Sequence, residues 1–276
     1  DLNSFKFSDN NLQFEVKSTS SLEVMDIARS FIANINIPNL TFNEFDAEAS
    51  MKDGKLIISS LIIKGEQTIL ESSGSINLDN FNDRNFEIKL SNFDEIDLIP
   101  SPKFIELMSH MNIKNINFDG FLSGSNLEIS QLQFLEDNQE ILVVAGETDF
   151  NNWDDSTFLN INFENISPAE LQKIVSWSNQ SNYQKYVDSY NFEEIQGSLF
   201  LDLESDAVII NDISLYLKDK EIGKLTGKIL DNKFIGDIDV EGINLSVIDK
   251  NFLKTDRLNG LLNLQINSPS YINNLN

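Results

Sequence analysis

Short segments of alternating apolar and polar residues follow one another along the chain, and this pattern predicts β-strands. In a strand, residues i and i+2 lie on the same face. The stretch 54–65, GKLIISSLIIKG, contains two apolar pairs that are separated by two serines: Leu56 and Ile58, then Leu61 and Ile63. All four side chains share one face only if Ser59-Ser60 forms a bend or tight turn that restores the phase.

The same pattern occurs twice more, as LEISQLQF at 127–134 and VIINDISL at 208–215. Each copy has an apolar-x-apolar pair, two polar residues and a second apolar-x-apolar pair. The aligned positions are Leu127, Ile129, Leu132 and Phe134 in the second copy, and Val208, Ile210, Ile213 and Leu215 in the third. Such self-similarity indicates an internal repeat, here with a period of about 70–80 residues.

The segments around the three copies also correspond. A strand of small residues follows each copy, with an aligned glycine: Gly74, Gly146 and Gly227. Three later strands carry an apolar-x-Gly-x-Leu phrase, and the first unit has alanine in that place: Gly120, Gly197, Gly260 and Ala47. The order of strands and glycines predicts a repeated unit, although chance similarity among β-rich segments is the alternative.

Each unit also contains the signals that begin a short helix. A serine precedes an apolar-periodic run at Ser20, at Ser101-Pro102 and at 167–170, SPAE. Serine at the N-cap, proline at the first helical position and glutamate at the third all favour a helix start, because they satisfy or remove unpaired N–H groups.

These elements predict a mostly β protein with short helices. We expect an elongated, repeating antiparallel sheet that curls into a groove, with about three and a half units of strand, short helix and strands. The units span roughly 14–85, 86–159, 160–235 and a partial 236–276. They form one continuous array over 1–276, and we expect this array to be a segment of a longer protein.

The apolar face of such a sheet must be covered by another layer. A second sheet would make a closed sandwich, and a ligand or helices would leave a curled, elongated sheet with a trough. A repeat favours the elongated form. The hydrophobic pattern alone leaves a filled core and an open groove as alternatives.

Composition narrows the range of functions. The formal net charge of −24 argues against nucleic acid as a partner, because phosphate recognition needs clustered Lys and Arg. The chain has no cysteine, which excludes disulfides, thiolate metal sites and a cysteine nucleophile. No apolar stretch approaches the length of about 18–20 residues that a membrane-spanning helix needs.

The sequence offers little support for catalysis or metal binding. His110 is the single histidine, so a zinc site or a histidine-based triad is not expected. Asp202, Glu204 and Asp206 alternate along a predicted strand and are interpreted as a solvated face rather than a calcium loop. We therefore expect no enzyme activity, no catalytic residues, no metal and no cofactor.

The order of elements resembles the bacterial AsmA-like superfamily, which includes the TamB and YhdP types. The resemblance rests on IQGSLFLDLES at 195–205, AVIINDISLYL at 207–217 and KLTGKI at 224–229, and on the parallel segments 118–134 and 143–150. It covers essentially the whole chain. These motifs are degenerate and contain no catalytic residue.

The resemblance implies a repeating β-groove rod that is anchored in the inner membrane and spans the periplasm. It further implies phospholipid transport toward the outer membrane, with acyl chains as the partner and the anchor outside this chain. The twelve aligned residues are then the expected hydrocarbon lining of the groove. The alternative is a repetitive structural or adhesive β protein, a sandwich or solenoid, without lipid cargo.

Overall fold

The computed structural model describes residues 4–8, 11–18, 43–94, 106, 108–109, 111–152, 156–177, 192–230, 233–244 and 261–272. The chain divides into two compact units. The first contains residues 1–105, 114–138 and 145–153, and the second contains 106–113, 139–144 and 154–276.

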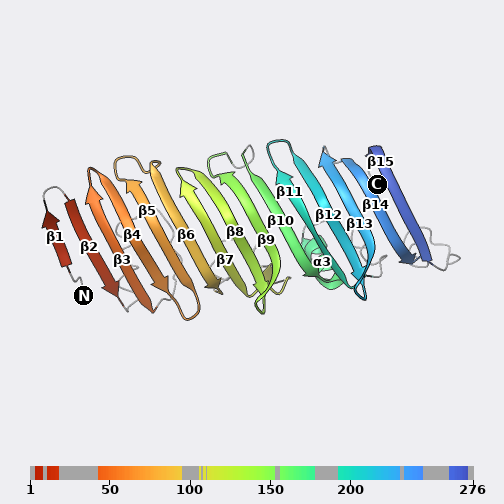
Figure 1. Cartoon of the computed structure of the whole chain (residues 1–276), viewed down its shortest axis with the longest axis horizontal. Helices are drawn as coiled ribbons and strands as arrows, with labels where there is room; N and C mark the ends of the chain where they lie inside the picture. The colour runs from red at the N-terminus through yellow and green to blue at the C-terminus, as the bar shows by residue number, and fades with distance from the viewer. Residues whose placement is uncertain are drawn as a thin grey trace. The chain divides into compact units, whose positions relative to one another are not determined.

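The described residues are mostly β-strand, in one sheet that does not close into a barrel. The strands are hydrogen-bonded in sequence order, β1 to β15, and the defined pairs are antiparallel (Figure 1). Strands β1 to β8 belong to the first unit: Ser4–Ser8, Asn11–Ser18, Glu44–Lys52, Lys55–Lys64, Ile69–Asn77, Arg84–Phe93, Asn115–Ser123 and Asn126–Glu136. Strand β9, Gln139–Asp149, has residues in both units. Strands β10 to β15 belong to the second unit: Phe158–Ile166, Glu194–Asp202, Ala207–Leu217, Lys220–Leu230, Lys233–Asn244 and Leu261–Ile272.

A β-bulge occurs in each of the three strands that carry the aligned apolar pairs, β4, β8 and β12. In β4 the partners on β3 are Ala49 for Ile58 and Glu48 for Ser60, so Ser59 has no partner. The corresponding extra residue is Ser130 in β8 and Asn211 in β12. One extra residue shifts the alternation by one position. The predicted bend is therefore a bulge, and it keeps both apolar pairs of each strand on one face.

A glycine with an unusual backbone conformation follows each bulged strand. Gly74, Gly146 and Gly227 have φ values of 157°, 150° and 152°, a range that L-residues with side chains rarely adopt. A Cβ atom on Gly74 would lie 2.0 Å from the carbonyl oxygen of Asn85. The sequence alignment of these three glycines thus corresponds to one shared backbone geometry.

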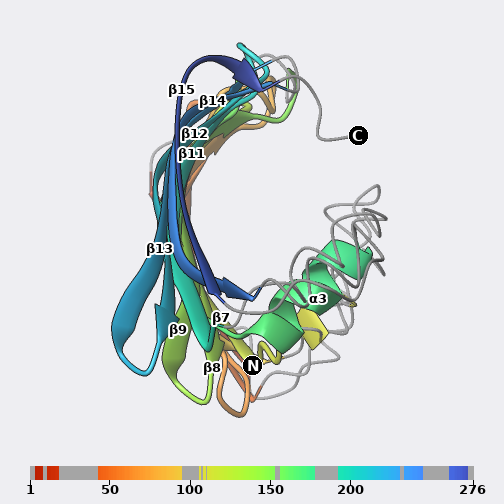
Figure 2. The ribbon, with the colours of Figure 1, turned by 90° about the vertical axis from the view of Figure 1, so that its right-hand side faces the viewer.

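Bulges and glycines of this kind bend β-strands along their length. In the second unit, strands β11 to β15 are visibly bent (Figure 2). The helix α3, Pro168–Trp177, lies on the side toward which these strands curve. The bent sheet of this unit therefore has one face turned toward α3 and one face turned away from it.

The start of α3 is a capping box, as the sequence predicts. The Ser167 backbone N–H donates to a Glu170 carboxylate oxygen at 2.7 Å, and the Glu170 N–H donates to Ser167 Oγ at 3.3 Å. The Ser167 hydroxyl also donates to that carboxylate at 2.7 Å. These reciprocal bonds satisfy two N–H groups of the helix start. The predicted helix after Ser20, His110 and Gly260 lie outside the described residues.

Two details of the sequence interpretation are wrong. Ala47 and Gly197 lie opposite the first apolar residue after a bulge, whereas Gly120 lies opposite Ile129, the last apolar residue before one. The phrase around Gly120 is therefore offset by two residues from the phrases around Ala47 and Gly197, relative to the bulge.

The second error concerns residues 202–206. The strand ends at Asp202 and the chain turns there, so the carboxylates of this segment do not line one strand face. Asp202 instead accepts a hydrogen bond from the Ser205 N–H at 3.1 Å.

Candidate functional site: the apolar face of the sheet

The twelve residues predicted to line a groove lie on β4, β8 and β12. In the first unit, cross-strand pairing extends the β4 and β8 positions into rows that consist of apolar and small residues. One row runs, from partner to partner, through Ala49, Ile58, Gly74, Phe86, Leu122 and Leu127. A second row runs through Phe45, Ile63, Leu70, Leu90, Phe118 and Leu132. We call this surface the apolar face of the first unit.

The second unit has the same arrangement around β12. One row runs through Leu159, Leu201, Val208, Ile229 and Phe234. Another runs through Phe163, Gly197, Ile213, Leu225 and Ile238. Strands on either side of β12 thus contribute as much of this apolar face as β12 itself. The sequence alignment missed them because it selected only positions that repeat in the same phrase.

The apolar residues are covered to different degrees. Of the twelve predicted residues, Phe134 is 4% exposed and Ile210 is 6% exposed, and the other ten are half-buried. In a closed core, aliphatic side chains of this kind are mostly fully buried. The described strands also belong to a single sheet. The apolar face therefore retains accessible hydrocarbon surface along most of its length.

The opposite face of the first unit is mostly polar, with Ile57, Ile62 and Phe121 among its polar residues. A row on this face passes from Asp46 through Ile62, Glu71, Lys89 and Asp119 to Gln131. Cross-strand ion pairs join Lys17 to Asp46 and Lys89 to Asp119, both at 3.2 Å. Hydrogen bonds to the Glu15 and Asp46 carboxylates raise the pKa of Lys17 above its usual range. This is the alternation of an antiparallel sheet with one face toward water.

The polar face of the second unit is held by neutral and charged hydrogen bonds. Gln196 Nε2 donates to the Tyr216 hydroxyl at 2.7 Å, and Ser198 Oγ donates to Asp212 at 3.0 Å. Each bond joins β11 to β12 on the face away from the aliphatic rows. Both units therefore carry polar side chains opposite the aliphatic rows, but in the second unit this face also includes the stacked rings of Phe158 and Phe200 and the side chains of Ile209 and Ile235.

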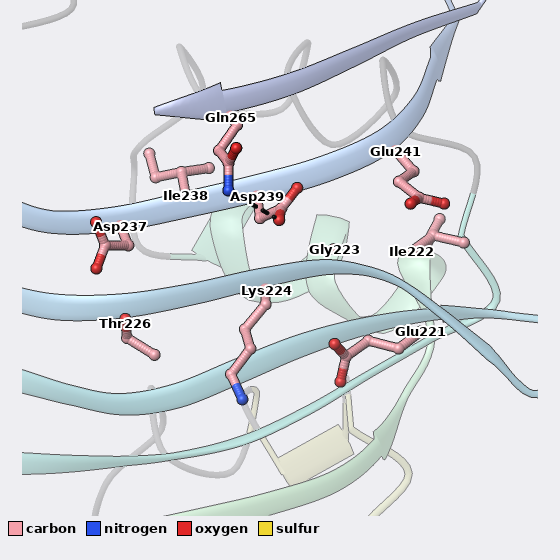
Figure 3. A pocket seen from close by; sticks show the side chains of 10 residues that line it. All are labelled: Glu221, Ile222, Gly223, Lys224, Thr226, Asp237, Ile238, Asp239, Glu241 and Gln265. Carbon is pink, nitrogen blue, oxygen red and sulfur yellow. Dashed lines mark hydrogen bonds between the residues drawn. The ribbon is translucent and has the colours of Figure 1, made fainter. Parts of the chain in front are cut away.

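Two shallow hollows lie over polar-face positions. One, of about 400 Å³, is lined by β13, β14 and β15 and contains Glu221, Lys224, Asp237, Asp239, Glu241 and Gln265, with Gln265 donating to Asp239 at 3.4 Å (Figure 3). The other, of about 410 Å³, surrounds the β4 bulge in the first unit. Their carboxylates and hydroxyls do not suit a hydrocarbon. Within the described residues, no group of three or more His, Cys, Asp or Glu side chains is arranged to hold a metal.

Comparisons of the chain with protein-family models, curated proteins and solved structures give no match. Among the described residues, no helix combines the length and the apolar character that crossing a bilayer requires.

Proposed function

We propose that the apolar face of the sheet binds the acyl chains of phospholipids and shields them from water. The protein is then a segment of a longer AsmA-like envelope protein that carries phospholipid between the inner and outer membranes. In this proposal the chain lies in the periplasm, with a membrane anchor elsewhere in the full-length protein. The role is one of transport, without catalysis or a cofactor.

The observation that carries the proposal is the incomplete cover of the apolar face in each unit. Ten of the twelve predicted lining residues stay half-buried although their strands are fully paired. Burying hydrocarbon against such a surface contributes about 0.8 kcal/mol per methylene and needs no polar partner. Acyl chains therefore match the chemistry of this face better than a polar or charged ligand does.

The proposal further includes a repeating groove. A bulge followed by a glycine of positive φ occurs three times along the chain, with the bulges at Ser59, Ser130 and Asn211. A bend at the same place in successive sequence repeats would turn a flat sheet into a trough that continues from one repeat to the next. This geometry suits a lipid that slides along the sheet rather than one held in a closed pocket.

The test is to extract the purified protein with organic solvent and to identify bound lipids by mass spectrometry. We expect phospholipid in the wild-type protein and a large loss of it in Ile129→Asp. An acyl chain on this face would have to remove water from the new carboxylate, which costs free energy. Gln131→Asp is the matched control, since it places the same carboxylate on the polar face of the same strand. It should retain the lipid.

Folding must be followed in the same samples by circular dichroism and thermal unfolding. Loss of lipid from a folded Ile129→Asp protein supports the proposal. Wild-type protein without phospholipid would contradict it and would favour a structural or adhesive β protein. Equal lipid loss from both variants would also contradict it, because binding would then not depend on the apolar face.

A further inference from the structure

One charged side chain interrupts the apolar face of the first unit. In the pairings from β3 to β8, the apolar-face position opposite Ile76 is Arg84, at the start of β6. It continues the column formed by Phe86, Ile88 and Leu90, because residues two apart share a face. The other paired positions on this face are apolar or small and neutral. Arg84 is thus the one charged residue among these paired positions.

The local contacts hold Arg84 in a defined position. Its Nε–H donates to the carbonyl oxygen of Gly124 at 2.8 Å, and the Gly124 N–H donates to the Arg84 carbonyl at 2.8 Å. The neighbouring carboxylate of Asp83 pairs instead with Lys55 at 3.1 Å and accepts from Asn77 at 3.1 Å. Among the described residues, Arg84 takes part in none of the ion pairs. Arg84 is half-buried, so part of the residue stays accessible.

Exposed apolar side chains lie in the connection that leads into Arg84. Phe81 is 62% exposed and Leu78 is 38% exposed. Phe150, at 55%, is tied to the neighbouring turn by its N–H bond to the Ser125 carbonyl at 3.0 Å. The hydrogen bonds of Arg84 to Gly124 and of Phe150 to Ser125 place both residues at the same turn between β7 and β8. Aromatic side chains beside a cation suit the boundary between hydrocarbon and a polar headgroup.

We infer that Leu78, Phe81, Arg84 and Phe150 form a headgroup rim, where Arg84 binds the phosphate of a phospholipid whose acyl chains lie on the apolar face. This inference rests on the proposed function and adds a place for the headgroup. Guanidinium and phosphate form charge-assisted hydrogen bonds. The net charge of −24 disfavours strongly anionic lipids, so the ligand is a zwitterionic phospholipid such as phosphatidylethanolamine.

The test compares two lipids with identical acyl chains, each with a fluorophore on the chain: phosphatidylethanolamine and diacylglycerol. Arg84→Met keeps an apolar stem but removes the charge, and it should weaken phosphatidylethanolamine binding by about tenfold. Diacylglycerol binding should not change. Lys89→Met is the matched control, because it removes a cation from the polar face of the same strand. It should leave both lipids unaffected.

Further variants separate a phosphate contact from a structural role. Arg84→Lys should recover part of the lost phosphatidylethanolamine affinity, because it restores the charge without the planar fork of arginine. Equal loss of both lipids in Arg84→Met would overturn the inference and assign the residue to the fold of the turn. No loss of either lipid would also overturn it.

A competition experiment distinguishes a lipid from free phosphate. Inorganic phosphate should not displace phosphatidylethanolamine, since the acyl chains supply most of the binding. Displacement by phosphate alone would contradict a lipid headgroup site. If the wild-type protein binds neither lipid, the proposed function itself fails, and that result differs from binding that is indifferent to Arg84.

Discussion

The two faces of strand β8 differ in composition although their residues alternate along the same backbone. Leu127, Ile129, Leu132 and Phe134 lie on one face, and Glu128, Ser130, Gln131 and Gln133 lie between them. Simple alternation would place Leu132 and Ile129 on opposite faces. The bulge at Ser130 prevents this. The apolar face of β8 therefore depends on the bulge residue Ser130 as well as on the hydrophobic residues themselves.

The faces also differ in the interactions that hold them. The ion pair between Lys89 and Asp119 joins side chains that are 58% and 49% exposed, and pairs of this kind contribute little in water. The apolar face instead gains from burial, most strongly at its covered positions such as Phe134 and Ile210. Stability should therefore depend on covered apolar residues, whereas half-buried ones remain available to a ligand.

The largest expected loss of stability follows from a substitution at a buried residue of the apolar face. Phe134→Ala removes an aromatic ring that is 4% exposed and should lower the free energy of unfolding by about 3–5 kcal/mol. Gln131→Ala, at an exposed position on the other face of the same strand, is the matched control and should have a small effect. Denaturant unfolding measures both. Similar losses for the two variants would show that the two faces are not distinguished by burial.

A smaller loss of stability is expected from substitution of the positive-φ glycines that follow the bulged strands. Gly227→Ala should lower the free energy of unfolding by about 1–3 kcal/mol, because φ is 152° and an added Cβ would lie 2.4 Å from the Ile235 carbonyl oxygen. In Gly223→Ala, on the same strand, the new Cβ meets the Leu215 side chain at 3.0 Å, which can move.

Thermal unfolding of the two glycine variants tests whether the bend has a specific backbone requirement. Gly223→Ala should lose less stability than Gly227→Ala. Equal losses would indicate that any added methyl group disturbs β13, and the shared φ of the three aligned glycines would then not be the reason for their spacing.

The smallest effect concerns a carboxylate outside the apolar face. Hydrogen bonds from Asn77 and then Lys55, together with the Lys55 charge, hold the pKa of Asp83 below its usual value. A depressed pKa in the folded state contributes stability above the unfolded pKa of about 4, and this contribution is lost as pH falls through the folded value. Asp83→Asn should therefore have a lower Tm than wild type at pH 7, and the difference should shrink in acid. A difference that is independent of pH would contradict this account.

Much of the fold could be predicted because the local signals agree with it. The apolar pairs predict β4, β8 and β12, and the split pairs require a phase correction, which the structure provides as bulges. The capping box at Ser167 and Glu170 predicts the start of α3 because both partners of each bond lie within one turn. Local chemistry of this kind is readable from neighbouring residues alone.

The rest depends on contacts between distant residues. The two-residue offset of Gly120 follows from its pairing with Ile129, and a glycine phrase carries no information about that register. The turn at 202–206 was missed for a local reason, because the Asp202 carboxylate accepts a hydrogen bond from Ser205 and this bond competes with strand alternation. Arg84 was missed because only its partner Ile76 and the column above it place the side chain on the apolar face.

The central claim is that lipid acyl chains lie on one face of the sheet. The most direct measurement uses a phospholipid with a photoreactive diazirine in its acyl chain and maps the cross-linked residues by tandem mass spectrometry. We expect adducts at Leu127 and Ile129 and at their half-buried neighbours on the same face, such as Leu122. Adducts spread equally over Glu128, Ser130 and Gln131, or confined to that polar face, would contradict the claim.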